Sequence, residues 1–105
     1  MHIDKLTTQF QNDLANAQSI ANSNKNSVIE PIHVLKAMTD DPQSTVSSLL
    51  SRSTNDFTIL KNDIAKEIKL LPSVGSHSGQ INISNSLLTL LNKTESIAKD
   101  YEDFS

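Results

Sequence analysis

Apolar residues near the start of the chain recur with the period of an α-helix. They are three or four residues apart and therefore share one helix face: Leu6, Phe10, Leu14, Ala17 and Ala21. Asp4 or Thr7 is expected to cap this helix, because either side chain can accept a hydrogen bond from a free backbone amide. The Asn- and Ser-rich run 22–27 predicts its end, since such side chains compete for backbone hydrogen bonds.

Three more helices are predicted before residue 72. Pro31 suits the first turn of the second helix, where its missing N–H costs nothing. The apolar face of that helix is predicted to be Ile32, Leu35 and Met38. A short helix over about 44–50 would present Val46, Leu49 and Leu50. The next, capped by Thr54 or Asp56 and ended by Pro72, carries the stripe Phe57, Leu60, Ile64, Ile68 and Leu71.

The last third of the chain predicts a loop and one final helix. Pro, Gly and Ser cluster between residues 72 and 80, which is typical of an exposed loop. Ser84 is expected to cap a helix whose apolar positions are Leu87, Leu88, Leu90, Leu91, Ile97 and Ala98. The acidic tail 99–105 is expected to begin another loop. No strand-like alternation competes with these helices, so the predicted fold class is all-α.

The first and last helices resemble each other in sequence. Residues 7–22 and 84–99 align without gaps, and Leu14, Ser19, Ile20 and Ala21 recur identically in the second segment. The matched apolar positions have the same helical phase, which predicts two similar helical units. A counterpart of the second helix would begin beyond Ser105. We therefore expect a fragment of a longer protein, cut within its second unit.

Composition and charge narrow the function classes. The net charge is −3 and Arg52 is the only arginine, so no basic stripe suggests nucleic-acid binding. No apolar run approaches the length of a membrane span, and the opening residues do not resemble a signal peptide. We expect a cytoplasmic protein with neither nucleic-acid nor membrane partners.

No residue pattern indicates catalysis or metal binding. The chain lacks cysteine, and its three histidines are too scattered to supply the ligands of a zinc site. His33 is expected to be an interface or a hydrogen-bonded core imidazole. The phosphate-binding signature GxxxxGK[ST], GxSxG and HExxH are all absent. We therefore expect no enzymatic activity, metal or cofactor for this chain.

The leucine-rich stripe of the final helix allows two interpretations. Leu87, Leu88, Leu90 and Leu91 cover too wide an arc for one small contact. Some of them could pack in the core while others line an apolar groove for a flexible peptide. The sequence does not divide them between core and groove.

Several separated motifs carry a family resemblance over the whole chain. The opening DKLTTQFQNDLANAQSIA, the segment IEPIHVLKAM, and LLPSVGSHSGQINIS followed by a helix ending in IAK occur in order and with matching spacing. Together they resemble the N-terminal, Clp-repeat domain of the ClpB family, which are ring-forming AAA+ disaggregase chaperones. The loop at 71–80 favours this branch over the related unfoldases that feed a protease.

The resemblance implies an all-helical bundle of two pseudo-repeats within one domain. The first repeat would span 1–71 with about four helices, 72–83 would be a Gly/Ser loop, and 84–105 would begin the second repeat. It also implies a non-catalytic domain that engages unfolded or aggregated polypeptide and helps deliver it to the hexameric ring during stress. ATP and Mg²⁺ would be bound only by the AAA+ modules of the parent protein.

The same resemblance suggests the substrate-binding positions. It places polar contacts at Thr7 and Asp103 and an apolar groove at Leu90 and Ile97, with Lys93 where a leucine is common. Thr7 also has the simpler role of a helix cap. The alternative function is an adaptor- or substrate-docking domain of a protease-linked Clp unfoldase.

Overall fold

The computed structural model describes residues 7–74 and 81–104, with the side chains of 98 and 101–104 outside that description. Five helices account for most of the described chain: α1 (Thr8–Ser23), α2 (Pro31–Asp40), α3 (Thr45–Ser53), α4 (Phe57–Lys69) and α5 (Asn85–Phe104). Two strands of two residues, β1 (Val28–Ile29) and β2 (Asn82–Ile83), complete it. The predicted all-α class is confirmed.

Two predicted caps, Thr7 and Ser84, are confirmed, and Ser44, where the third helix was expected to start, also caps its helix. The side-chain oxygens of Thr7, Ser44 and Ser84 each accept a hydrogen bond from the amide three residues later, at 3.0–3.1 Å. Asp56 occupies the cap position of α4, although its side chain makes no capping bond. Asp4 lies outside the described residues.

The predicted end of the last helix is wrong. We expected the acidic tail 99–105 to begin a loop, but α5 continues to Phe104. The tail contains neither Pro nor Gly, so nothing in its backbone chemistry interrupts the helix.

The short parallel bridge between β1 and β2 was not predicted. Val28 pairs with Asn82 and Ile29 with Ile83, and the Ser84 amide donates to the Ile29 carbonyl at 2.9 Å. Two-residue strands are too short to show alternation, and parallel pairing joins segments far apart in the chain. The bridge fixes the start of α5 beside the start of α2.

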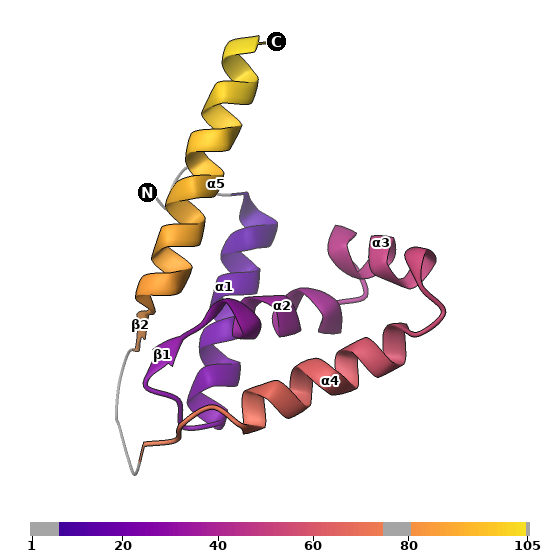
Figure 1. The fold of residues 1–105 in the computed structure, drawn as a ribbon, viewed down its shortest axis with the longest axis vertical. Coiled ribbons are helices and arrows are strands. Elements are labelled where there is room, and N and C mark those ends of the chain that lie inside the picture. The colour runs from indigo at the N-terminus through magenta and orange to yellow at the C-terminus, as the bar shows by residue number, and fades with distance from the viewer. Residues whose placement is uncertain (1–6, 75–80, 105) are drawn as a thin grey trace.

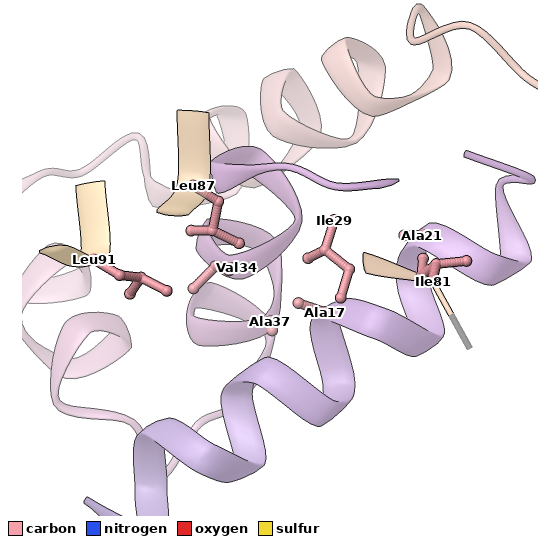
Figure 2. Close-up of a cluster of buried hydrophobic side chains, with 8 residues drawn as sticks. All are labelled: Ala17, Ala21, Ile29, Val34, Ala37, Ile81, Leu87 and Leu91. Carbon is pink, nitrogen blue, oxygen red and sulfur yellow. The ribbon is translucent and has the colours of Figure 1, made fainter. Parts of the chain in front are cut away.

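One apolar core joins α1, α2 and α5 (Figure 2). Leu87 and Leu91 of α5 point toward Val34 of α2, while Ala17 of α1 lies below them. The buried set is Ala17, Ala21, Ile29, Val34, Ala37, Ile81, Leu87 and Leu91. Small alanines on α1 and α2 allow these two helices to approach closely.

Two predicted apolar faces need correction. In α2 the buried positions are His33, Val34, Ala37 and Thr39. Of the predicted face, Leu35 is 37% exposed, whereas Ile32 and Met38 are partly buried. Leu49 was predicted to lie on the apolar face of α3, but its side chain is 56% exposed. The buried side of α2 faces α1 and α4. These contacts, and not the hydrophobicity of each residue, decide which α2 side chains are buried. The α4 stripe is confirmed by buried Ile64 and Ile68.

Helix α5 projects from the rest of the molecule. Its N-terminal half lies beside α1 and the β bridge, and its C-terminal half extends beyond the other helices (Figure 1). The radius of gyration is 14.8 Å, above the roughly 13 Å expected for a compact chain of this length. A projecting helix leaves much of its surface unpacked.

Candidate binding surface

The two ends of α5 differ in burial. Leu87 and Leu91, one turn apart, are 1% and 8% exposed and join the core. Beyond Leu91, none of the described side chains of α5 is buried. The first two turns therefore anchor the helix, and the following turns present their side chains to solvent.

The structure shows which leucines of the α5 stripe are buried and which are exposed, a distinction that the sequence did not make. Leu87 and Leu91 are core, whereas Leu88 and Leu90 are 41% and 50% exposed. At about 100° per residue, Leu88 and Leu90 lie on opposite flanks of the buried edge, about 160° apart. Each flank therefore presents a different exposed surface.

Leu90 and Ile97 share one flank of α5. They are seven residues apart, which places them within about 20° of each other around the helix axis. Ile97 is 63% exposed, and Lys93, between them on the same side, is also exposed. We call Leu90 and Ile97 the α5 apolar flank. Its exposed apolar area is available for contact, with a cation beside it.

The other predicted site residues do not join this flank. Thr7 is exposed at the start of α1, and its hydroxyl oxygen accepts from the Phe10 amide at 3.1 Å. Asp103 is on α5, six residues after Ile97 and hence about 120° around the axis from it. Its side chain lies outside the described residues. Among the predicted site residues whose side chains are described, only Leu90 and Ile97 share a surface.

Of the two predicted roles for His33, an interface or a hydrogen-bonded core imidazole, the structure confirms the second. His33 is fully buried, its Nδ1 accepts from the Glu30 amide at 2.8 Å, and its Nε2 lies 2.8 Å from Asn26 Oδ1. Since Asn26 Oδ1 can only accept, Nε2 must carry the proton. Burial lowers the pKa of His33, and the negative charge of Glu30 opposes that shift.

The polar loop that ends α1 has a larger role than its sequence suggested. Asn26 is 3% exposed, and its amide nitrogen donates to the Pro72 carbonyl at 3.1 Å. Asn24 donates to the Ile68 carbonyl at 2.8 Å. These bonds attach the end of α4 to the end of α1. Their partners are more than forty residues away, so no local pattern could have identified them.

The described part of the chain offers neither a metal site nor a membrane-spanning helix. Residues 7–74 and 81–104 contain no group of three His, Asp or Glu side chains placed to hold a metal ion. None of the described helices is long and apolar enough to cross a membrane.

Comparisons with known proteins place this all-α domain in a family. Residues 5–104 match the Clp repeat (R) N-terminal domain. The chaperone protein ClpB of Pseudomonas putida is 32% identical over 103 residues, which are 98% of this chain and 12% of the relative. ClpB of Rhodopirellula baltica is 37% identical over 101 residues, 96% of this chain and 11% of the relative.

The match covers nearly the whole chain, so this protein belongs to the Clp repeat N-terminal domain family. ClpB of Rickettsia felis is 32% identical over 104 residues, which are 98% of this chain and 12% of the relative. The chain spans only 11–12% of the length of these curated relatives. Its similarity is to their N-terminal region, and the resemblance inferred from the motifs is confirmed.

Proposed function

We propose that this chain is a non-catalytic, substrate-engaging domain of an ATP-dependent, protein-disaggregating chaperone. It would bind unfolded or aggregated polypeptide and help deliver it to the hexameric AAA+ ring of a larger protein. ATP and Mg²⁺ would be bound by that ring and not by this chain. The proposal is supported by the match to the N-terminal regions of relatives named chaperone protein ClpB.

The observation that carries the binding role is the α5 apolar flank. Leu90 and Ile97 are half or more exposed, although Leu87 and Leu91 of the same helix are core. An unfolded polypeptide offers apolar side chains and an adaptable backbone, so it can cover such a flank without a matching fold. Lys93 limits the contact to a narrow apolar strip, which favours weak and unselective binding.

The first test substitutes the apolar flank. Leu90→Glu should reduce binding of unfolded casein by about tenfold, since burial of an exposed leucine contributes about 1–2 kcal/mol. The matched control is Leu88→Glu, which adds the same charge to the opposite flank and should change affinity less than about twofold. Fluorescence anisotropy of labelled casein would report both. Undetectable binding by the unsubstituted chain, or equal loss in both variants, would contradict the proposal.

Thr7 tests the predicted polar contact. Thr7→Ala removes both the hydroxyl and the N-cap, and should cost about 1 kcal/mol of stability. Thr7→Ser keeps the cap oxygen. If Thr7 contacts substrate, casein binding should fall for Thr7→Ala at a temperature where both variants are fully folded by circular dichroism. Unchanged binding would restrict Thr7 to its role as a helix cap.

The alternative is an adaptor-docking domain of a protease-linked Clp unfoldase. The reported relatives all carry the ClpB name, which favours the disaggregase proposal. Capture of a small folded adaptor, with no affinity for unfolded casein, would instead support the alternative.

A further inference from the structure

A second surface lies at the opposite end of α1 from its cap. The C-terminal turns of α1 and α4 lie side by side beneath α2 (Figure 1). An open groove of about 370 Å³ is formed there by Ser19, Ile20, Ser23, Asn24, Lys36, Ala65, Ile68 and Lys69. We call it the α1–α4 groove. None of its residues belongs to the α5 apolar flank.

The groove has an apolar floor and a cationic rim. Ile20, Ala65 and Ile68 supply the apolar contacts. Lys36 and Lys69 are its charged residues, and no carboxylate lines it. Its volume is near the lower end for ligand sites, so it has room for one or two side chains and not for a folded domain.

The positive charge of the rim is not cancelled by its neighbours. Lys36 and Lys61 both approach the carboxylate of Asp40, at 2.8 and 3.7 Å, so one carboxylate faces two ammonium groups. Within the described residues Lys69 has no carboxylate partner. Asp63 and Glu67 of α4 lie about 120–160° around the helix from Lys69. The C-terminal ends of α1 and α4 each add a partial negative charge of about half a unit. Three lysines against one carboxylate still leave a local positive surplus, in a chain whose net charge is −3.

We propose that the α1–α4 groove binds a polypeptide segment in which one apolar side chain is flanked by carboxylates. The apolar side chain would cover Ile20, Ala65 and Ile68, and the carboxylates would pair with Lys36 and Lys69. Because the protein as a whole is acidic, long-range attraction does not favour such a peptide. Binding depends on the local lysines, which makes it selective for acidic segments and independent of the α5 apolar flank.

Lys69 also has a structural role, and the test must distinguish it from a role in ligand binding. It lies in the last turn of α4, where a cation offsets the partial negative charge of the helix end. A substitution of Lys69 can therefore lower stability without affecting a ligand. Stability and binding must be measured on the same variant.

The experiment titrates the chain with a short labelled peptide carrying a central leucine between pairs of aspartates. Lys69→Glu should weaken anisotropy-detected binding by about tenfold or more, because it replaces attraction with repulsion. The matched control Lys99→Glu makes the same change in net charge on exposed α5 and should alter affinity less than about twofold. Higher ionic strength should also weaken binding.

Two further measurements test the proposal, one with a variant that fills the groove and one with an uncharged peptide. Ala65→Leu fills the groove without changing its charge and should abolish binding while urea unfolding shows a folded chain. A peptide with asparagine in place of aspartate should bind at least tenfold more weakly. Equal affinity for the two peptides, equal effects of Lys69→Glu and Lys99→Glu, or full binding by Ala65→Leu would overturn the proposal. Leu90→Glu should leave this binding intact, so failure here is distinct from failure of the proposed casein binding.

Discussion

At the scale of single residues, His33 shows how a polar group can be accommodated in a small core. Its two ring nitrogens have complementary partners, the Glu30 amide as donor and Asn26 Oδ1 as acceptor. Only the neutral imidazole protonated on Nε2 satisfies both. A second proton on Nδ1 would face the Glu30 N–H, so protonation removes a hydrogen bond within a buried site.

This arrangement predicts a loss of stability in mild acid. The pKa of His33 is lower in the folded chain than its ordinary 6.5, so the unfolded chain binds the proton first. Stability should be unaffected by His33 above about pH 7 and should fall as pH decreases through 6.5, by at most about 1.4 kcal/mol per unit. The fall should level off below the folded pKa. Urea unfolding at pH 7.5 and 5.5 measures it.

The non-titrating variant His33→Gln supplies the control. Its difference in stability between the two pH values should be smaller than that of the unsubstituted chain, whatever its absolute stability. Identical pH dependence in both chains would show that His33 is not the group responsible.

At the scale of elements, α5 combines a core edge with an exposed flank. Leu87 is the largest fully buried side chain among the described residues, whereas Leu88, its neighbour in sequence, is 41% exposed. Both are leucines in the first turn of one helix. Their difference comes from the direction in which the helix faces α2, as Figure 2 shows for Leu87.

Alanine substitutions of the two leucines should therefore differ in their effect on stability. Leu87→Ala should destabilise the chain by about 2–5 kcal/mol, because it removes buried methyl groups and leaves a cavity beside Val34. Leu88→Ala should change stability by no more than about 0.5 kcal/mol. Chemical unfolding followed by circular dichroism compares the two. Similar losses of stability in the two variants would mean that α5 does not pack through Leu87.

At the scale of the whole molecule, the helices are not equally supported. Helix α1 contributes buried Ala17 and Ala21 and is covered by α2, whereas α5 has no buried described side chain after Leu91. Hydrogen bonds within a helix protect amides only as long as the helix stays docked. The outer part of α5 should therefore open more readily than α1.

Amide hydrogen exchange tests this difference. Amides of residues 93–97 should exchange faster than those of 17–21 in a monomeric chain. A concentration series is the control, since self-association through the α5 apolar flank would slow exchange as concentration rises. Equal protection of both segments at every concentration would show that α5 is held by contacts other than those of Leu87 and Leu91.

The internal repeat remains a prediction at this scale. Thr7 and Ser84 cap α1 and α5 with the same hydrogen bond, which agrees with the aligned segments. The burial of the aligned positions differs: Ala17 is fully buried, whereas Thr94, which aligns with it, is exposed. Over their first turns the two helices use the same face, because Phe10 and Leu14 pack against the core that contains their aligned partners Leu87 and Leu91. The difference at Thr94 arises where α5 leaves the core. The boundaries 1–71, 72–83 and 84–105 are likewise untested predictions.

The sequence by itself determined where most helices begin and the all-α class. Capping by Thr7, Ser44 and Ser84 acts over three residues, and helical periodicity over a few turns, so both can be read from local sequence. Its motifs also identified the family. These features depend on neighbours along the chain and survive any change in how the helices pack.

Only the tertiary structure decided which side of each helix is buried. It placed Val34 in the core and left Leu35 exposed, and it assigned Leu91 to the core and Leu90 to the surface. It also joined the ends of α1 and α4 into a groove and paired β1 with β2. The physical reason is the same in each case: burial is set by contacts between segments distant in the chain, and hydrophobicity alone does not specify which apolar face meets them.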